Sequence, residues 1–580
     1  MAVAWMPGLR EWQVASVEAG TAELAEKLKT SHLVAQTLYN RGVRDLEQAQ
    51  VFLNPKLSYL HDPEMLHGAA EAAQKIAAMV ASGGKIVIYG DYDVDGMTAV
   101  SILHACLKLL GANVSYYVPH RIEEGYGLNS QAVEKLIADG AKMIITVDCG
   151  INAIDEANIA RRAGVEMIIT DHHGLGDTLP EASSIVHPAM GDYPNPHLCG
   201  AGVAMKLAWQ IARACGGERR VDERMRNFLL DATCMAALGT IADVVPLTGE
   251  NRVLAIFGLK GLQGTKHTGL KALLASADLD NKQLDAYHVG FVLGPRLNAC
   301  GRMGHAGLAV ELLTEAPREK CDQIAEHLKE QNAQRQKVER EILEQALEEV
   351  RRQGLDDPSH KIITLWGDDW HGGVIGIVAS RIVDQFGKPA ILIANNGDGL
   401  GHGSGRSIPG FDMRAALEAC GSHLLSFGGH AMAGGLRIEP TKLEAFAEAI
   451  GRYALDNIND KQLALPLTLD AHATLAELTP LVVNQLESLS PFGQGNPPPR
   501  FMFCGCEVMT PPKRMGRGGR AVQFFVGQDK SSVRVVGFSM GDLADSLQVG
   551  SRIDLAAQPA VNRFNGNTSL QLVLADVQFS

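Results

Sequence analysis

Short, uninterrupted apolar runs recur in the first half of the chain, and helix-length segments separate them. Three of the clearest runs cover residues 85–90, 143–147 and 167–170. Strands buried in a parallel sheet read as continuous apolar runs, and strands that alternate with helices are typical of βαβ units. The pattern predicts a doubly wound α/β sheet between about residues 70 and 245.

The middle of the chain has a different pattern. Residues 246–315 are mostly helical in pattern, and residues 318–352 contain neither Pro nor Gly while apolar residues recur at helical spacing. The second stretch predicts one long connecting helix. A coiled-coil partner site is the alternative, but Gln331 and Arg335 interrupt the apolar stripe.

The α/β pattern returns after Gly354, and strands dominate beyond Pro466. Five short strands separated by turn residues predict a small barrel, such as an OB-fold. These changes divide the chain into five predicted parts: a helical cap (1–60), a catalytic α/β domain (61–317), a connecting helix (318–353), a second α/β domain (354–458) and a barrel (466–580).

Composition narrows the class of protein. The chain has 580 residues, 46% of them hydrophobic, and a formal net charge of -13. No window approaches the ~20 apolar residues of a membrane helix, and the N-terminus lacks a secretory signal pattern. The ten cysteines contain no Cys-x-x-Cys pair. We therefore expect a cytoplasmic enzyme with reduced thiols, whose contacts with nucleic acid depend on local basic patches or bound metal.

Acidic clusters follow the three apolar runs. Asp91, Asp93 and Asp95 follow the first, Asp148 follows the second, and Asp171-His172-His173 follows the third. Open α/β sheets bind ligands at the carboxyl ends of their strands, so these side chains are expected to meet. Carboxylates with imidazoles suit one or two divalent cations, Mn²⁺ or Mg²⁺, and metal-assisted hydrolysis.

Two further acidic features leave alternatives open. Residues 91–96 resemble the start of an EF-hand loop, but Ile102 stands where that loop needs a bidentate carboxylate. Asp243 lies in an otherwise apolar stretch and needs a partner if it is buried. Spacing alone favours metal ligation and a structural cap equally for this residue.

The ordered motifs at residues 91–96, at Asp148, at Asp171-His172-His173 and at Asp243 resemble those of the DHH phosphoesterase superfamily. Nearly the whole chain is similar to that superfamily's branch of bacterial single-stranded-DNA-specific exonucleases, through further segments at 118–128, 370–381, 404–407 and 428–435. The resemblance implies a DHH-type parallel sheet domain joined by a long helix to a DHH-associated α/β domain, plus an OB-fold-like barrel.

The resemblance also implies a site for two divalent cations, Mn²⁺ or Mg²⁺. Its implied metal ligands are Asp93, Asp95, Asp148, His172 and Asp243. Asp91, Asp171 and His173 are implied as further ligands or as residues that orient the ligands. Other branches of the superfamily carry a His at the position of Tyr89, and Asp91 is the implied substitute here.

The implied substrate contacts are spread over three parts of the chain. In the DHH-associated domain, Gly429 and His430 would approach the scissile phosphate, and Ser404 with Arg406 would hold a terminal 5′-phosphate. Either Arg296 or Arg302 would share that anchor, and Arg121 is a further implied contact. In the barrel, the candidates are Arg514, Arg517 and Arg520 for phosphates and Phe524, Phe525 and Phe564 for bases.

The implied activity is a metal-dependent 5′→3′ exonuclease that hydrolyses single-stranded DNA to 5′-mononucleotides in recombination, repair and mismatch repair. The implied partners are a single-stranded-DNA-binding protein and a RecQ-type helicase, and we expect a monomer that does not bind a membrane. Two rival functions remain: a hydrolase of small substrates such as dinucleotides, which would need no barrel, and a catalytically dead DNA-binding scaffold. The complete set of metal-motif carboxylates argues against the scaffold.

Overall fold

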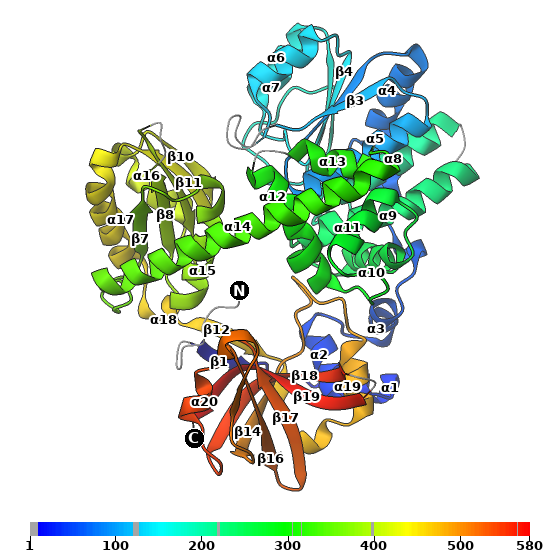
Figure 1. Ribbon diagram of the computed structural model, residues 1–580. Helices are drawn as coiled ribbons and strands as arrows, with labels where there is room; N and C mark the ends of the chain where they lie inside the picture. The colour runs from blue at the N-terminus through cyan, green and yellow to red at the C-terminus, as the bar shows by residue number, and fades with distance from the viewer. Residues whose placement is uncertain are drawn as a thin grey trace. The chain divides into compact units, whose positions relative to one another are not determined.

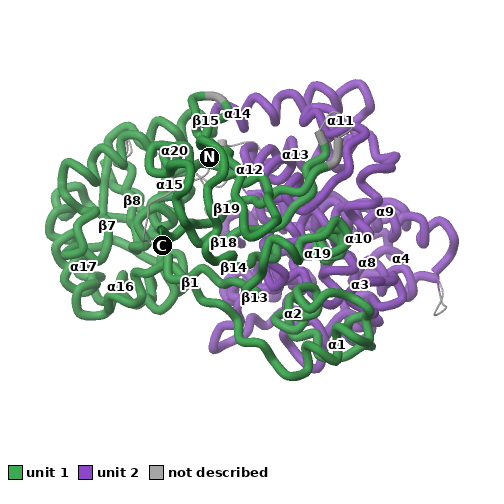
Figure 2. The backbone as a smooth tube through the Cα atoms, turned by 90° about the horizontal axis from the view of Figure 1, so that it is seen from below, with its two compact units in different colours: residues 1–49, 335–489, 498–580 green, residues 50–334, 490–497 purple. Residues whose placement is uncertain are grey.

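The computed structural model describes residues 10–119, 127–216, 221–303, 306–314, 316–395, 399–564 and 567–579. The chain forms two compact units (Figure 2). Unit 1 comprises residues 1–49, 335–489 and 498–580, and unit 2 comprises residues 50–334 and 490–497. None of the described helices is both long enough and apolar enough to cross a membrane.

A five-stranded sheet, parallel throughout, forms the centre of unit 2 (Figure 1). Every residue of the two strands at Ile86–Gly90 and Met143–Val147 is buried, as the apolar runs predict. Alternate residues pack on opposite faces: Ile86 and Ile88 join one core, and Val87 and Tyr89 the other. In spatial order, the strands are β3 (Val114–Tyr117), β2 (Ile86–Gly90), β4 (Met143–Val147), β5 (Glu166–Thr170) and β6 (Ser184–Val186).

Helices complete unit 2. They are α4 (Ala69–Ser82), α5 (Val94–Leu109), α6 (Ser130–Ala138), α7 (Ile154–Arg162), α8 (Gly200–Gly216), α9 (Glu223–Ala242), α10 (Gly249–Gln263), α11 (Thr268–Ser276), the π-helix η3 (His288–Leu293), α12 (Gly294–Met303) and α13 (Ala306–Thr314). The segment 490–497 returns from the C-terminal part of the chain to this unit. There Gln494 O accepts from Leu247 N at 2.8 Å, and Ser490 O accepts from Arg252 Nη2 at 2.8 Å.

The predicted connecting helix is present as α14 (Arg318–Gln353), which begins in unit 2 and ends in unit 1. Within unit 1, Glu339 of this helix accepts from Arg335 at 2.8 Å and from Arg381 at 2.7 Å. Both bonds join charged groups and are largely shielded from solvent, which makes them stronger than exposed ion pairs. The bond from Arg381 joins α14 to α15 (Gly372–Phe386), whereas the bond from Arg335 lies within α14.

The second α/β domain of unit 1 contains a mixed five-stranded sheet. Its spatial order is β10 (Ser426–His430), β11 (Ala433–Ile438), β9 (Gly401–Arg406), β8 (Ala390–Asn395) and β7 (Ile363–Gly367). Only the β7–β8 pair is parallel. The helices are α15, α16 (Met413–Ala419) and α17 (Leu443–Asn457). Because β10 comes first in the spatial order, it forms an edge of the sheet.

The rest of unit 1 is the predicted C-terminal barrel with the N-terminal segment. The spatial order is β13 (Ala471–His472), β14 (Phe501–Val508), β18 (Arg552–Phe564), β19 (Asn567–Phe579), β17 (Ser531–Gly537), β16 (Ala521–Gln528) and β15 (Lys513–Met515), and an additional β14–β16 pairing closes the sheet. The strand β1 (Arg10–Val14) pairs with β12 (Leu465–Leu469). The short helices are α1 (Gly20–Leu28), α2 (His32–Asn40), α18 (Asp460–Leu463), α19 (Pro480–Glu487) and α20 (Leu543–Ser546), and α3 (Leu46–Leu53) crosses from unit 1 into unit 2. The predicted fold class is confirmed.

Candidate metal centre

The acidic clusters meet where the strand order of the unit 2 sheet reverses. The chain moves from β2 outward to β3 and then returns to β4 on the other side of β2. Ligands bind at such a switch point, outside the carboxyl ends of the strands. Asp91, Asp93 and Asp95 follow β2, and Asp148 follows β4. The predicted convergence is therefore a consequence of topology.

Backbone N–H groups fix the first cluster. Asp93 caps α5 and accepts from Gly96 N at 3.0 Å. Asp95 is almost completely buried, and its two oxygens accept from Gly200 N at 2.6 Å and Ala201 N at 2.8 Å. Both donors lie in the first turn of α8, where the helix dipole favours negative charge. Asp95 is thus held in one orientation by the protein alone.

Asp148 is held just as closely. Its φ of 60° lies in the left-handed region, which Asp tolerates better than most residues. Its backbone N donates to Thr170 O at 3.0 Å. A Cβ on Gly200 would lie 2.7 Å from the Asp148 Cβ, so only glycine allows α8 to approach. Sequence reasoning missed Gly200 and Ala201, although the Gly-containing start of α8 was a signal for close approach.

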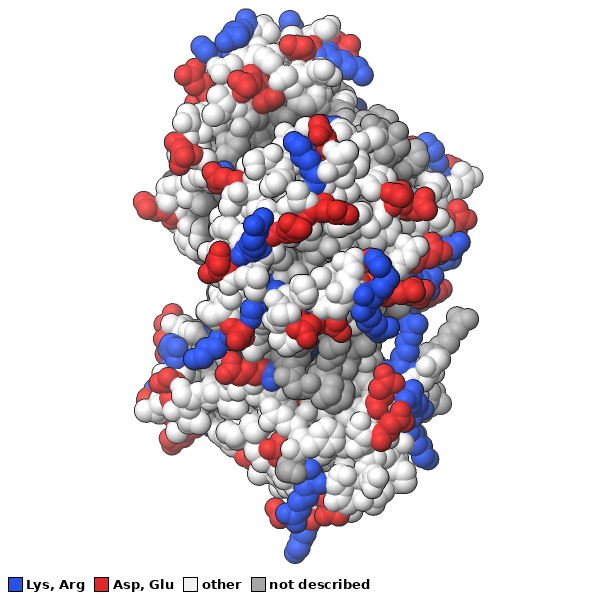
Figure 3. All heavy atoms as spheres, turned by 90° about the vertical axis from the view of Figure 1, so that its left-hand side faces the viewer, with Lys and Arg blue, Asp and Glu red and all other residues white. Residues whose placement is uncertain are grey.

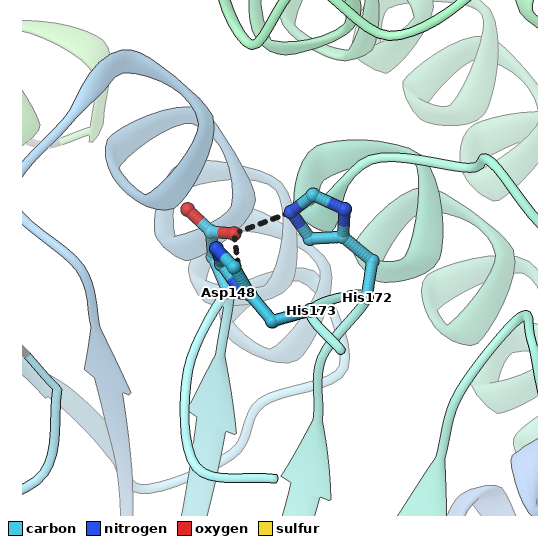
Figure 4. A group of neighbouring side chains, drawn as sticks. All are labelled: Asp148, His172 and His173. Carbon is cyan, nitrogen blue, oxygen red and sulfur yellow. Dashed lines mark hydrogen bonds and ion pairs between the residues drawn. The ribbon is translucent and has the colours of Figure 1, made fainter. Parts of the chain in front are cut away.

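His172 connects the clusters. Its Nε2 lies 3.0 Å from Asp148 Oδ1, 3.6 Å from Asp243 Oδ2 and 3.7 Å from Asp95 Oδ2. Both His172 and His173 reach the same Asp148 oxygen (Figure 4). Among the described residues, three groups bring their ligand atoms within 4.8 Å of one another: Asp148 with His172 and His173, Asp95 with His172 and Asp243, and Asp91 with Asp93 and Asp148.

Asp171 orients His173. The His173 Nδ1 lies 2.7 Å from Asp171 Oδ1, and the other Asp171 oxygen accepts from Ile151 N at 2.9 Å. Burial lowers the pKa of His173, but the hydrogen bond and charge of Asp171 outweigh it and raise the pKa to about 9. Burial raises the pKa of Asp171, and the contacts with His173 outweigh it and lower the pKa. His173 is therefore cationic at neutral pH.

The remaining carboxylates repel one another. Burial raises the pKa of Asp148 well above its ordinary value, and Asp95 and Asp93 raise it further. Burial, Asp95 and Asp93 likewise raise the pKa of Asp243 to about 8. Burial lowers the pKa of His172, which favours the neutral imidazole that binds metals. A cluster with this charge distribution fits a cation, which would offset the repulsion.

Asp243 is the C-terminal cap of α9, and its carboxylate also lies in one of the three candidate ligand groups. One turn earlier, a Cβ on Gly239 would lie 2.3 Å from Asp95 Oδ1. The helix that presents Asp243 therefore leaves room for Asp95. Tyr89 is completely buried, and its hydroxyl donates to Gly127 O at 3.2 Å, whereas Asp91 lies in the cluster.

The predicted arginines of unit 2 are only partly described. Arg296 and Arg302 both lie on α12, and Arg296 Nη1 donates to Val292 O at 2.7 Å. The same helix reaches the metal cluster, because Asn298 Oδ1 accepts from Val94 N at 3.0 Å. Arg121 lies outside the described residues. Asn298 was not predicted from the sequence.

The predicted phosphate contacts of unit 1 come from β9 and β10, the two strands that flank β11. Arg406 donates through Nη1 to Ser404 Oγ at 3.0 Å. A Cβ on Gly376 would lie 2.8 Å from that oxygen and 2.9 Å from Arg406 Nη2, so the start of α15 approaches both side chains. Gly429 and His430 lie on β10, all five residues of which are exposed. These groups are accessible to a ligand.

The predicted contacts of the barrel differ in whether a ligand can reach their side chains. Arg514 is engaged on the barrel itself, through ion pairs at 2.6 Å to Asp545 and 3.1 Å to Asp542. Arg520 is exposed, and the Arg517 side chain lies outside the described part of the chain. Phe524 is buried and cannot stack on a base, whereas Phe525 is exposed; the Phe564 side chain is not among those described.

The face drawn in Figure 3 carries Lys and Arg interspersed with Asp and Glu. This face has no continuous field of one sign. Because the formal net charge of the chain is -13, attraction of a polyanion must come from particular groups rather than from the general charge.

Comparison with known proteins identifies the family. Family models match the chain as the DHH family, N-terminal domain (residues 85–237), the DHHA1 domain (359–456) and the RecJ OB domain (469–576). The single-stranded-DNA-specific exonuclease RecJ of Bacillus subtilis is 36% identical over 560 residues, which cover 96% of this chain and 69% of that protein. The chain belongs to the RecJ family of single-stranded-DNA-specific exonucleases.

Solved RecJ structures resemble the whole chain. RecJ from Thermus thermophilus in complex with Mn²⁺ matches with a TM-score of 0.84 and 31% identity, over 99% of this chain and 80% of that one. The same protein in complex with Mg²⁺ matches with a TM-score of 0.78 and 30% identity, over 98% and 78% of the two chains. The predicted membership of the DHH superfamily and its RecJ branch is confirmed.

Proposed function

We propose that this chain is a metal-dependent exonuclease that removes nucleotides from the 5′ end of single-stranded DNA. The observation that carries the proposal is the set of three overlapping ligand groups at the switch point of a RecJ-type sheet. The 5′→3′ polarity and the release of 5′-mononucleotides are parts of this proposal.

The donor set fits two divalent cations, Mn²⁺ or Mg²⁺. Asp91, Asp93 and Asp148 would hold one, and Asp95, His172 and Asp243 the other. Oxygen-rich donors with one imidazole are the ligands that these cations accept. When bound, a pair of such cations activates a water molecule and stabilises the departing oxygen of a phosphodiester.

The chain's own residues supply orientation and charge. The bonds from Gly200, Ala201 and Ile151 hold Asp95 and Asp171 before any ligand arrives. Prepositioned groups lose little freedom on binding, and this lowers the barrier of the reaction. His173, cationic at neutral pH, offsets negative charge beside the cluster. We assign Asp171 and His173 this orienting role.

We further propose that unit 1 binds the DNA backbone. Arg406, with Ser404, would hold the terminal 5′-phosphate, and the exposed Gly429 and His430 of β10 would approach a phosphate. In unit 2, Arg296 or Arg302 is the proposed further contact. The barrel, through Arg520 and Phe525, would bind the strand further along.

The proposed cellular role is in recombination and repair, in the cytoplasm. A single-stranded-DNA-binding protein and a RecQ-type helicase are the proposed partners, and a monomer is the proposed active form. Membership of the RecJ family supports these proposals.

One digestion tests the function. A long single-stranded DNA labelled separately at each end is incubated with Mn²⁺ or EDTA, using the wild type, Asp148→Ala and the exposed control Asp155→Ala. The proposal requires early release of the 5′ label as mononucleotide, abolished by EDTA and by Asp148→Ala and preserved in Asp155→Ala. Release from the 3′ end would overturn the polarity, and tight binding without digestion under any metal would favour a scaffold.

A further inference from the structure

Two aromatic rings are exposed together on the helix beside the metal centre. Tyr287 caps the π-helix η3, and Phe291 lies within it. Their exposed fractions are 62% and 70%, and their rings stack with centroids 5.0 Å apart and planes 23° apart. Large aromatic side chains normally bury most of their area, so a stacked pair in solvent marks a binding surface.

The core of unit 2 does not need these rings. Val289 and Leu293, from the same π-helix, are buried and belong to the main apolar core of the unit. The aromatic pair occupies positions i and i+4, which share one side of a helix. A π-helix is rare, and such turns are frequent at functional sites. Its exposed side is therefore available for a ligand.

The helix connects this surface to the catalytic loops. Gly294 directly follows η3, and a Cβ there would lie 3.7 Å from Ala242 and 3.9 Å from Val94. Ala242 precedes Asp243, and Val94 lies between Asp93 and Asp95. Phe291 is three residues from Gly294, about one helical turn. The rings are thus within a few nucleotide lengths of the metal cluster.

One arginine follows this surface on the next helix. Arg296 lies three residues after the π-helix; its Nη1 donates to Val292 O at 2.7 Å, and its buried Nε has no hydrogen-bond partner among the described residues. Aromatic faces stack on any unpaired base, and a neighbouring guanidinium binds the backbone. Bases inside a duplex already stack on one another, so a platform of this kind selects single strands.

We propose that Tyr287 and Phe291 form a stacking platform for the bases of single-stranded DNA as the strand approaches the metal centre. The inference rests on the proposed function, because it assigns a base contact to that same substrate. It separates two tasks within unit 2, since the metal cluster acts on the phosphodiester and the platform binds the bases.

A binding cycle tests the platform. Fluorescence anisotropy in EDTA measures two Kd values, one for a short oligothymidylate and one for the same oligonucleotide with several bases removed. Both are measured for the wild type and for Tyr287→Ala/Phe291→Ala. The variant should bind the normal oligonucleotide about five- to hundredfold more weakly, the range for loss of one stacked base, and the base-free one nearly unchanged. Leu230→Ala, which removes exposed apolar surface elsewhere in unit 2, is the matched control.

The ratio of the two Kd values separates stacking from structural damage. A variant that loses affinity for both oligonucleotides equally, or for neither, overturns the platform. The Kd of the base-free oligonucleotide divided by the Kd of the normal one should keep its wild-type value in Phe291→Trp and should fall in Phe291→Leu. A wild-type ratio in Phe291→Leu overturns stacking as the cause. Hydrolysis of the normal oligonucleotide with Mn²⁺ is measured in parallel; its absence in the wild type contradicts the proposed function, while the ratio in EDTA still decides the platform.

Discussion

The metal centre of unit 2 and the glycine-rich strands of unit 1 hold their polar groups in opposite ways. Asp95, Asp148 and Asp171 are each at most 3% exposed. By contrast, every residue of β10 is exposed. The first site is fixed from several sides by backbone donors and close packing, and the second offers a backbone that a ligand can reach. Groups that take part in chemistry need fixed geometry, whereas groups that bind a long strand need access.

Removal of His172 should have the largest effect, because its Nε2 lies within 3.7 Å of three different carboxylates. We expect His172→Ala to lower kcat/KM for single-stranded DNA by about a thousandfold or more, since metal centres supply several kcal/mol of transition-state stabilisation. Digestion rates with Mn²⁺ measure the loss. A rate within tenfold of wild type, at equal Tm, would exclude His172 from the catalytic centre.

Gly239→Ala should disturb the same centre with a smaller loss of rate, because it displaces a carboxylate without removing it. The new Cβ would meet Asp95 Oδ1 at 2.3 Å, so the carboxylate must move. A misplacement of about 1 Å can cost about a hundredfold in rate, and we expect a loss of that size in kcat. Gly216→Ala is the control, because no atom lies within 4 Å of its added Cβ. Equal rates in both variants would show that the position of Asp95 is not critical.

In unit 1, the same kind of substitution should affect binding rather than chemistry. Gly429 has φ +135°, and an added Cβ would meet Ala433 O at 2.4 Å; nothing lies within 4 Å of a Cβ on Gly428. Gly429→Ala should raise KM about tenfold, from ~1.4 kcal/mol of strain or displacement, and leave kcat nearly unchanged. Steady-state kinetics decide this. If a phosphate approaches the backbone closely, Gly428→Ala raises KM as well, without lowering Tm.

The last expected effect is on stability rather than on rate or binding of the substrate. At Mn²⁺ about 100 times its Kd, binding should add about 2.7 kcal/mol and raise Tm by several degrees. A carboxyl whose pKa is raised by folding destabilises the folded state above its ordinary pKa. The metal-free protein should therefore lose stability as pH rises from the ordinary 3.8 of Asp243 to its folded value of about 8.

The gain from Mn²⁺ should follow the same titration. It should be larger at pH 8.5 than at pH 6.5, because binding at the lower pH must first release a proton. Differential scanning calorimetry at both pH values measures it, and the matched sample is Asp243→Asn. A gain independent of pH in the wild type would contradict the raised pKa of Asp243.

Much of this centre could be predicted from the sequence because strand ends carry topological information. The apolar runs before Asp91, Asp148 and Asp171 predicted parallel strands, and parallel strands bring their carboxyl ends together. The groups that hold the ligands could not be predicted in the same way. Gly200 and Gly239 act through the space that they leave, which depends on how α8 and α9 pack.

In the barrel, the sequence did not predict which side chains are buried or paired. Alternation along β16 required one of Phe524 and Phe525 to be buried but did not say which, and the structure buries Phe524. Similarly, residues 500–580 contain nine Lys or Arg against six Asp or Glu, and this count did not reveal that Arg514 forms ion pairs with two aspartates of the barrel. Side-chain partners that come from distant positions are set by register and packing, which periodicity alone does not fix.

The return of residues 490–497 to unit 2 has a consequence for how the protein can be dissected. Leu247, four residues after Asp243, depends on Gln494 for the partner of its backbone N–H, and Arg252 depends on Ser490. A fragment that stops before this segment would leave the loop beyond Asp243 without its support. The catalytic unit and the barrel are thus poor candidates for exchange as independent modules, since no single cut in the chain separates them intact.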